Sequence, residues 1–458
     1  MKIKLDTSDK YLMVAIKIIE ILNNNGFQCF VIGGFVRDSL LYIPNDDIDL
    51  VTSATTEQIE KLFPTYDIGK NKQMGVSVIK FNDYIFEIAT FRKDLYCSLN
   101  VRCAESVSIT NSLEEDCKRR DFTINSLAMN SNGDIIDFNN GLEDLNNKVI
   151  KFIGNGNTRL EEDQIRSLRA LRLASKLSFT IDHQTISAIK DNVKNINLIA
   201  PERIFQEFQK AASQSGEKVA SFILSLWYIG LLKEILPEID CLNSFEHDKK
   251  DHSDGNPFSH TLGALRANEN NDYVQNLSIL FHDVGKAATH TINERGNHFY
   301  GHDNASIPII DKIAKRLKFP NDLKETILFC AFNHMRMHKF IEMSNNKCLK
   351  LIEDKNFEYL LQTAYCDSYS NKIHWSSDYW NLILKKIETL KNSYNNQNSS
   401  QSVKKVINGK LVMKLRNITK PDKDVGIIIK KSIDFVVDNN ISLNDMNKIS
   451  DFIVNLEV

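Results

Sequence analysis

Residues 31–51 place a glycine pair, an arginine and two spaced carboxylates in one short segment. Residues 29–32 predict a short buried strand, after which Gly33 and Gly34 let the backbone turn and approach another group closely. Apolar residues then recur at helical spacing, so the amides of residues 34–36 are expected to open a helix whose N-terminus favours an anion. Arg37 adds a positive charge there, and the segment therefore predicts a phosphate cradle.

Asp47 and Asp49 flank the apolar Ile48 and precede Leu50 and Val51, a pattern that predicts a strand with both carboxylates on one face. Parallel carboxylates repel each other unless a cation lies between them. Beside a phosphate cradle, this pair indicates Mg²⁺-assisted phosphoryl or nucleotidyl transfer, with one ion activating a hydroxyl and one neutralising pyrophosphate. Asp-x-Asp alone is more typical of a solvated turn, so the upstream glycines and arginine decide the interpretation.

Length and composition limit the number of domains and the cellular location, but they do not identify a binding partner. The chain has 458 residues, enough for about three domains, and its formal net charge is −2, so a nucleic-acid partner has to be argued from local patches. Eight scattered cysteines without Cys-x-x-Cys spacing fit reduced thiols. The sequence shows neither a signal segment nor an apolar run long enough to span a bilayer, so we expect a cytoplasmic protein and no membrane partner.

A second block spans residues 115–128. Arg119 and Arg120 can hold phosphates, and Asp121 and Asn125 are predicted to share a helical face at i, i+4, a spacing suited to sugar hydroxyls. The alternative is a solvated cluster of salt bridges.

The stretch over residues 161–177 is predicted to be one amphipathic helix that buries Leu168, Leu171 and Ala174 and carries a run of arginines. Asp163 and Arg166 at i, i+3 share a face. An acceptor beside a donor can pair with the exocyclic amine and ring nitrogen of cytosine or adenine and mismatches uracil and guanine. The alternative is an ordinary i, i+3 salt bridge.

Nine of the eleven histidines lie between residues 247 and 338. Such clustering indicates a metal site. The residues that fall in the order of a helical HD-domain phosphohydrolase are His260, His282, Asp283, His302, His334 and Asp367. His290 and His338 are instead expected to be ordinary core histidines.

Residues 31–51 resemble the signature of the class II tRNA nucleotidyltransferase and bacterial poly(A) polymerase family, within the polymerase-beta-like superfamily. The resemblance implies an α+β fold: a nucleotidyltransferase head with a mixed sheet and helices (1–150), a helical neck (151–240), an HD domain (241–375) and a helical tail (376–458). It implies catalytic, Mg²⁺-binding roles for Asp47 and Asp49. The nucleotide-binding residues that it implies are Gly33, Gly34, Arg37, Arg119, Arg120, Asp121, Asn125, Asp163, Arg166, Arg169 and Arg172.

Among the other segments, some resemble the corresponding family motifs and one departs from them. Glu87 precedes Thr90-Phe91-Arg92 and is a candidate additional carboxylate, although a surface strand glutamate is nearly as good an interpretation. Residues 96–102 depart from the family's Gly-Arg-Arg-Pro-like stretch. Residues 136–144 resemble its hinge, and residues 392–402 read as a linker or exposed loop. The lysines beyond it could grip tRNA phosphates or form a solvated face.

The resemblance implies a template-independent enzyme that adds the 3′-terminal CCA of tRNA from CTP and ATP. Poly(A) polymerase, C-only addition and A-only addition remain open alternatives. The HD-like residues imply a divalent metal of unknown identity and phosphatase or phosphodiesterase activity. A further alternative, from another class, is an RNA-binding protein in which the HD site alone works.

Overall fold

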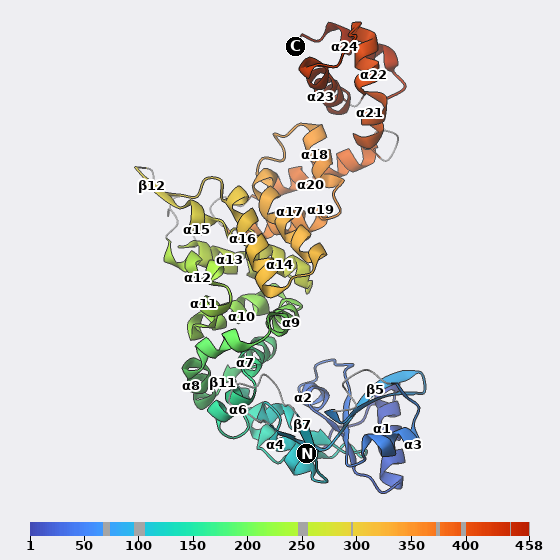
Figure 1. Cartoon of the computed structure of the whole chain (residues 1–458), viewed down its shortest axis with the longest axis vertical. Coiled ribbons are helices and arrows are strands. Elements are labelled where there is room, and N and C mark those ends of the chain that lie inside the picture. The colour runs from blue at the N-terminus through green and yellow to red at the C-terminus, as the bar shows by residue number, and fades with distance from the viewer. Residues whose placement is uncertain are drawn as a thin grey trace. The chain divides into compact units, whose positions relative to one another are not determined.

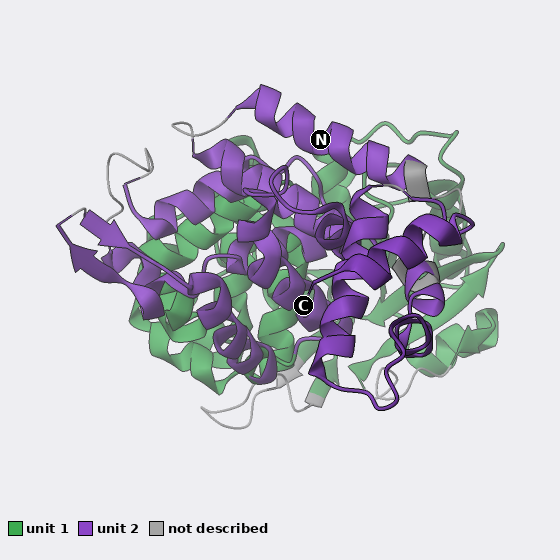
Figure 2. Ribbon diagram, turned by 90° about the horizontal axis from the view of Figure 1, so that it is seen from above, with its two compact units in different colours: residues 1–240, 316–318 green, residues 241–315, 319–458 purple. Residues whose placement is uncertain are grey.

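The computed structural model describes residues 1–66, 74–95, 106–245, 255–294, 296–371, 376–394, 400–439 and 441–457. The chain divides into two compact units, residues 1–240 with 316–318 and residues 241–315 with 319–458, which Figure 2 shows in green and purple. The division into four domains stays a prediction. The departure from the family pattern at residues 96–102 lies outside the described residues.

The first unit contains a seven-stranded mixed sheet. Its strands are β1 (Cys29–Ile32), β2 (Asp49–Thr52), β3 (Thr65–Tyr66), β4 (Val76–Phe81), β5 (Tyr84–Thr90), β8 (Ala128–Met129) and β9 (Ile135–Ile136), in the order β3-β4-β5-β2-β1-β8-β9. β2 and β5 run parallel, and the other neighbouring pairs run antiparallel. In Figure 1 these strands occupy the blue and cyan part of an otherwise mostly helical chain. The predicted α+β fold class is confirmed.

Short-range sequence signals explain the elements around this sheet. α1 (Lys10–Asn24) buries its apolar face and contacts β1. α3 (Thr56–Leu62) begins at a capping box in which Thr55 and Gln58 satisfy each other's backbone amides. Asn82 and Asp83 both have positive φ, the backbone that a tight β4–β5 hairpin requires.

The remaining elements of the first unit are mostly helices. They are α2 (Gly34–Leu40), β6 (Arg92–Leu95), β7 (Ser106–Ile109), α4 (Leu113–Lys118), the 3₁₀ turn η2 (Thr123–Asn125), α5 (Gly141–Asn146), β10 (Val149–Ile150), α6 (Gly156–Glu162), α7 (Ile165–Leu177), β11 (Thr180–Ile181), α8 (His183–Asp191), η3 (Val193–Leu198), α9 (Pro201–Ala212), α10 (Gly216–Ile229), α11 (Leu231–Ile235) and α12 (Pro237–Asp240). α7 packs against α9 and α10 and thereby forms the centre of the helical part.

In the residues that the structure describes, the second unit is helical apart from one short hairpin. Its elements are η4 (Cys241–Ser244), α13 (Pro257–Arg266), α14 (Tyr273–Phe281), α15 (Lys286–Thr289), β12 (Thr291–Asn293), β13 (Gly296–His298), α16 (His302–Leu317), α17 (Asn321–Met337), α18 (Asn345–Ile352), α19 (Phe357–Ser370), α20 (Ser377–Tyr394), α21 (Ser400–Val406), α22 (Gly409–Arg416), α23 (Lys423–Asp438) and α24 (Met446–Asn455). One hydrophobic core runs from Cys330 on α17 to Ile453 on α24.

Two further predictions can be compared with these elements. The linker expected over residues 392–402 is partly helical, because α20 continues to Tyr394 and α21 begins at Ser400. Within the described residues, every helix is too short or too polar to cross a membrane.

Candidate active site and candidate metal centre

The first glycine of the pair lies beside residues from two other parts of the head. Gly33 follows β1 and has φ 85° and ψ −134°, a backbone that glycine adopts far more easily than other residues. A Cβ at this position would lie 3.5 Å from Nη1 of Arg120 and 3.8 Å from Oδ2 of Asp49. The structure thus brings three of the predicted site residues together around one turn.

Asp49 and Glu87 occupy the same register position on neighbouring parallel strands. Both residues are exposed, whereas the residues that follow them, Leu50 and Ile88, are buried. Strand alternation therefore directs the two carboxylates to the same exposed face of the sheet. Glu87 thus lies beside Asp49 on the sheet, as its candidate role requires.

Asp47 reaches this region from a loop. β2 begins at Asp49, so the expectation that Asp47 also lies on a strand is wrong. The side chain of Asn45 explains the difference, because its Oδ1 accepts a hydrogen bond from the amide of Asp47 at 2.9 Å and holds the chain in a turn.

The carboxylate of Asp49 is poised to be neutralised by a cation. Although the residue as a whole is exposed, neighbouring groups partly shield its carboxylate from water, and this desolvation raises the pKa of Asp49 to about 6. The charges of Asp47 and Glu87 add to this effect, and Arg120 opposes it. Arg119 and Arg120 are themselves held by the fully buried Asp116, which accepts from Nε of Arg119 at 2.9 Å and Nη2 of Arg120 at 3.3 Å. Sequence reasoning missed Asp116, although its i, i+3 and i, i+4 spacing to the two arginines is a visible signal.

Arg37 and Gly34 lie close to each other on α2. Arg37 is buried, pairs with Asp38 at 2.6 Å through Nη2 and donates through Nη1 to Oδ1 of Asn125 at 2.5 Å. A Cβ at Gly34 would lie 3.7 Å from Nη2 of Arg37. The contacts of Arg37 are therefore with protein groups, and its predicted contact with phosphate stays a prediction.

Asp121 and Asn125 are close together, but not on the predicted helix. α4 ends at Lys118, and Asn125 belongs to the 3₁₀ turn η2, so the expected i, i+4 helical spacing is wrong. Oδ1 of Asp121 accepts from the amide of Phe122 at 2.9 Å, a local bond that competes with helix formation. Nδ2 of Asn125 still donates to Oδ1 of Asp121 at 3.2 Å.

The predicted helix over residues 161–177 is interrupted at Asp163. α6 ends at Glu162, Asp163 has an extended backbone, and α7 begins at Ile165. A side chain again contributes, because Oδ1 of Asp163 accepts from the amide of Ile165 at 3.2 Å, a local bond that competes with continuation of the helix. The expectation of one continuous helix is wrong, whereas the burial of Leu168, Leu171 and Ala174 is confirmed.

Asp163 and Arg166 each have other partners in this structure. Arg203 donates to both carboxylate oxygens of Asp163, at 3.1 and 2.7 Å. Arg166 is buried, pairs with Glu162, and donates to the carbonyls of Arg159 at 3.0 Å and Arg119 at 3.3 Å. A direct Asp163–Arg166 salt bridge is not among these contacts of the described residues. The proposed base template therefore has its own supporting residues, Glu162 and Arg203.

The other two arginines of α7 form ion pairs. Arg169 donates through Nε to Oδ2 of Asp121 at 2.8 Å, and Arg172 donates through Nε to Oε2 of Glu207 at 2.6 Å. Burial opposes ionisation of Asp121, but Arg169 and Asn125 outweigh it and lower the pKa of Asp121 to about 2. Arg169 therefore connects the predicted neck to the predicted ribose-binding residue of the head.

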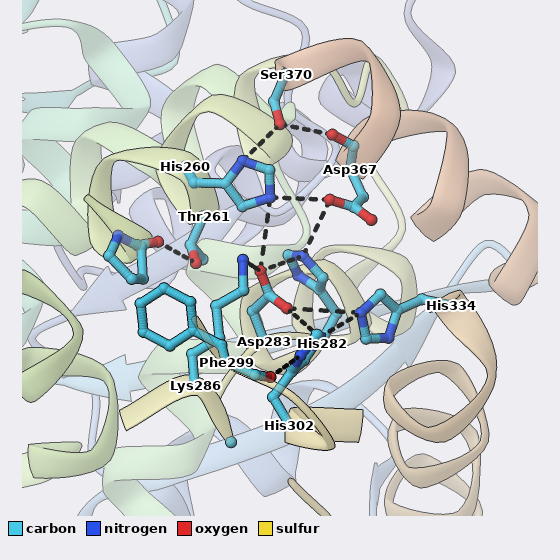
Figure 3. A network of polar contacts seen from close by, with 12 residues as sticks. His260, Thr261, His282, Asp283, Lys286, Phe299, His302, His334, Asp367 and Ser370 are labelled. Atoms are coloured by element: carbon cyan, nitrogen blue, oxygen red, sulfur yellow. Dashed lines mark hydrogen bonds and ion pairs between the residues drawn. The ribbon is translucent and has the colours of Figure 1, made fainter. Parts of the chain in front are cut away.

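The six HD-like residues converge in the second unit (Figure 3). His260 lies on α13, His282 and Asp283 follow α14, His302 begins α16, and His334 and Asp367 lie on α17 and α19. Asp283 lies at the centre, with its Oδ2 3.2 Å from Nε2 of His282 and its Oδ1 3.1 Å from Nε2 of His302. Residues almost 110 positions apart thus form one cluster.

Backbone and hydroxyl groups fix the orientation of these imidazoles. The Nδ1 atoms of His282, His302 and His334 contact the carbonyls of Ile279, Phe299 and Ala331 at 2.7, 2.9 and 2.8 Å. Nδ1 of His260 lies 3.1 Å from Oγ of Ser370, a residue that sequence reasoning missed. Such partners fix the ring orientation of metal-binding histidines and leave Nε2 for the metal.

The donor set fits a divalent metal ion. Within the described part of the chain, the groups whose donor atoms all lie within 4.8 Å of one another are His260, His282, Asp283 and Asp367, and Asp283, His302 and His334. Nε2 of His282 and Oδ2 of Asp283 are buried and lie 3.2 Å from each other, and Oδ2 also lies close to Nζ of Lys286. Burial opposes protonation of His282, but Asp283 and Asp367 raise its pKa to about 10, which shows how strongly the cluster favours positive charge.

A cavity of about 620 Å³ adjoins this cluster. Its lining includes Lys286, whose Nζ lies 2.6 Å from Oδ2 of Asp283, and His338, whose Nε2 lies 2.9 Å from Oδ2 of Asp367. The expectation that His338 is an ordinary core histidine is wrong, because it lines the cavity. His338 follows His334 by four residues, a spacing that could have indicated that the two histidines lie on the same side of the helix. His290 contacts Asn297 instead.

The mixed sheet and its neighbouring carboxylates place the head in the polymerase-beta-like nucleotidyltransferase class. A family model described as the poly A polymerase head domain matches residues 29–151, and one described as the probable RNA and SrmB-binding site of polymerase A matches residues 178–242. A multifunctional CCA protein of Legionella pneumophila is 31% identical over 375 residues, which are 78% of this chain and 89% of that protein. The chain belongs to the family of CCA-adding enzymes and poly(A) polymerases.

Other relatives match a shorter part. A CCA-adding enzyme of Enterococcus faecalis is 40% identical over 208 residues, 45% of this chain and 50% of that enzyme. In this and similar matches the chain spans about half the length of the relative. The crystal structure of the Bacillus stearothermophilus CCA-adding enzyme in complex with CTP has the same fold, with a TM-score of 0.70, 22% identity and 97% coverage of both chains. This family implies dependence on a divalent metal.

Proposed function

We propose that this protein is a template-independent tRNA nucleotidyltransferase that builds or repairs the 3′-terminal CCA from CTP and ATP. The observation that carries the proposal is the 31% identity to the Legionella multifunctional CCA protein over 89% of that protein. The juxtaposition of Gly33, Asp49 and Arg120 supports it, because nucleotidyl transfer needs a close backbone approach, a metal ligand and a phosphate-binding cation at one place.

Asp47 and Asp49, with Glu87 beside them, would hold Mg²⁺, which when bound favours deprotonation of the attacking hydroxyl and offsets charge on the phosphates. The tRNA 3′-hydroxyl attacks the α-phosphorus of the nucleotide, and pyrophosphate leaves. Arg119 and Arg120, presented by Asp116, would offset negative charge on the triphosphate.

The sugar and the base need separate recognition. Asp121 and Asn125 are hydrogen-bonded to each other and would bind ribose hydroxyls. Asp163 would accept from the exocyclic amine of cytosine or adenine, and Arg166 would donate to the ring nitrogen. Arg203 and Glu162 would hold these two side chains in place, so base selection depends on residues that do not touch the base.

The remaining predictions follow from this function. The division at residues 150, 240 and 375 would separate the head, neck, HD domain and tail, and the lysines of the tail would bind tRNA phosphates. A tRNA substrate also fits the predicted cytoplasmic location.

The test uses labelled CTP and ATP, separately and together with Mg²⁺, on tRNA transcripts that end before CCA, after C and after CC. We expect addition of C, C and A, followed by arrest. Unlimited addition of A to these transcripts and to oligo(A) would identify a poly(A) polymerase, and addition of only one nucleotide type would identify a partial tRNA nucleotidyltransferase.

A second candidate function is hydrolysis of phosphate esters at the HD site. The converging donors of His260, His282, Asp283, His302, His334 and Asp367 favour it. A bound divalent metal would polarise the phosphate, and Lys286 would add a positive charge at the cavity wall. Loss of nucleotide incorporation with retained phosphatase activity in Asp49→Ala would support two sites, whereas unchanged incorporation would contradict the catalytic role of Asp49.

A further inference from the structure

Asp38 is a fully buried carboxylate next to the candidate active site. It lies on α2, and its Oδ1 accepts from Nε of Arg37 at 2.7 Å and lies 2.6 Å from Nη2 of the same residue. Its Oδ2 accepts from Nδ2 of Asn45 at 2.9 Å and lies 3.4 Å from Nζ of Lys176. One oxygen is sufficient to pair with Arg37, so the second oxygen holds groups outside α2.

Asn45 connects this carboxylate to the turn that carries Asp47. Its Nδ2 donates to Oδ2 of Asp38, and its Oδ1 accepts from the amide of Asp47, both at 2.9 Å. A side-chain amide donates at one end and accepts at the other, which these two partners require, because a carboxylate only accepts and a backbone amide only donates. Alanine at position 45 would make neither bond, and aspartate would turn an acceptor toward the carboxylate of Asp38.

The contact between these two side chains adjoins the glycine turn of the candidate active site. A Cβ at Gly34 would lie 3.7 Å from both Nη2 of Arg37 and Nδ2 of Asn45. Asp47 is exposed two residues beyond Asn45, and its charge raises the pKa of Asp49. The turn therefore brings a second carboxylate close enough to Asp49 to affect it electrostatically, which is the arrangement that a shared cation needs.

Lys176 joins the same carboxylate to the helix of the proposed base-selecting arginine. Lys176 and Arg166 both lie on α7. Arg169 precedes Lys176 by seven residues and therefore lies on the same face, two turns away, where it pairs with Asp121 of the predicted head. α7 is thus attached to the head at two points, and one of them is the carboxylate that holds Asn45.

We propose that Asp38 is a positioning residue for nucleotidyl transfer: through Asn45 it sets the turn that presents Asp47 to the metal, and through Lys176 it holds that turn against α7. Asp38 acts only through these neighbours. The inference rests on the proposed nucleotidyltransferase function. An ion pair that only neutralised Arg37 would stabilise the fold without affecting Asp47, so the dependence on metal separates the two roles.

The test measures how Mg²⁺ affects nucleotide binding and incorporation in the full chain. Incorporation of labelled CTP into a tRNA transcript that ends before CCA is followed in single turnovers over a range of Mg²⁺ concentrations. CTP affinity is measured by calorimetry with Mg²⁺ and with EDTA, so that one readout does not depend on turnover. In Asn45→Ala we expect the Mg²⁺ concentration for half-maximal incorporation to rise about tenfold, because residues that orient metal ligands contribute about 10–100-fold to metal affinity. The CTP affinity in EDTA should stay unchanged.

Exchanging the two side chains tests their contact directly. Asn45→Asp keeps an acceptor for the amide of Asp47 but places a second carboxylate against Asp38, so it should lose at least as much Mg²⁺ affinity as Asn45→Ala. Asp38→Asn/Asn45→Asp restores one donor and one acceptor and should recover part of that loss. Lys176→Met removes the longest contact, and we expect a rise of about threefold, as for a partly exposed ion pair.

Asn130 provides a matched control. Its Oδ1 accepts from the amide of Asn132 at 2.9 Å, and its Nδ2 donates to Oδ2 of Asp134 at 3.2 Å, which is the same bonding pattern outside the candidate active site. Asn130→Ala should keep the wild-type Mg²⁺ dependence. Urea unfolding and circular dichroism check that each variant is folded, and the variants of the half-buried Asn45 decide the question if Asp38→Asn does not fold.

The outcomes separate this inference from the proposed function. Asp49→Ala defines the CTP affinity that remains without the head metal site. Wild-type Mg²⁺ dependence in both Asn45→Ala and Asn45→Asp would overturn the positioning role and leave the nucleotidyltransferase function intact. A wild-type protein that neither incorporates CTP nor binds it more tightly with Mg²⁺ would overturn both.

Discussion

Asp163 and Arg203 form a bidentate ion pair, with distances of 2.7 and 3.1 Å between the carboxylate oxygens and the guanidinium nitrogens. Arg203 lies in the first turn of a different helix, α9, 40 residues further along the chain. The pair therefore holds, from a second helix, the side chain proposed to select the base. Base selection should depend on Arg203.

Removing that support should weaken discrimination. In Arg203→Ala we expect the kcat/KM for CTP to fall about tenfold relative to that for UTP, because a bidentate contact contributes about 1–3 kcal/mol of discrimination. Arg203→Lys should be intermediate, because lysine keeps the charge without the fork. Arg316→Ala removes a similar bidentate pair with Glu238 outside the site and should leave the ratio unchanged. An unchanged ratio in Arg203→Ala would contradict the role.

Asp49→Ala should abolish nucleotide incorporation and leave the HD reaction intact. Loss of a proposed metal ligand is expected to reduce incorporation by at least about 100-fold. The exposed neighbour Asp46→Ala is the control and should stay close to wild type. Single-turnover incorporation and phosphatase assays on the same preparation measure both reactions. Parallel loss of both would indicate misfolding rather than a local role.

A comparison of Gly33 and Gly26 separates two effects of an alanine substitution: the free-energy cost of a positive φ and the disturbance of the candidate active site. Their φ values are 85° and 83°, but a Cβ at Gly26 meets nothing within 4 Å, whereas one at Gly33 lies beside Arg120 and Asp49. Both alanine variants should lose about 1 kcal/mol of unfolding free energy, measured in urea. Only Gly33→Ala should also lose incorporation. Normal turnover in Gly33→Ala would show that this turn does not need a close approach.

The ion pair between Asp121 and Arg169 should make stability depend on pH. Because the folded pKa of Asp121 is lowered to about 2, its ionised form stabilises the fold by about 2 kcal/mol at pH 7. This contribution is complete above about pH 4, the unfolded pKa, and is lost as the pH falls through about 2. Urea unfolding of the wild type and Asp121→Asn should therefore differ at pH 7 and converge toward pH 2. The exposed Asp191→Asn should show no such difference.

Local patterns were sufficient where neighbouring residues decide the structure. The periodicity of α1, the capping box at Thr55 and the hairpin at Asn82 and Asp83 follow from the local sequence, because each depends on contacts within a few residues. The breaks at Asp121 and Asp163 were missed. In both cases an aspartate side chain accepts a hydrogen bond from a nearby backbone amide, and this bond competes with the helical hydrogen bonds. The spacing of apolar residues gives no sign of that competition.

The sequence by itself determined the order and spacing of the motif residues. That order was sufficient to predict the family, the fold class and the set of histidines that form the cluster. Only the tertiary structure decided their partners. Glu87 lies beside Asp49 because β2 and β5 pair in parallel, and the histidines meet around Asp283 because α14 packs against α13 and α17. The physical reason is that spacing along a chain fixes contacts within a helix turn or a strand, whereas contacts between distant elements depend on how those elements pack.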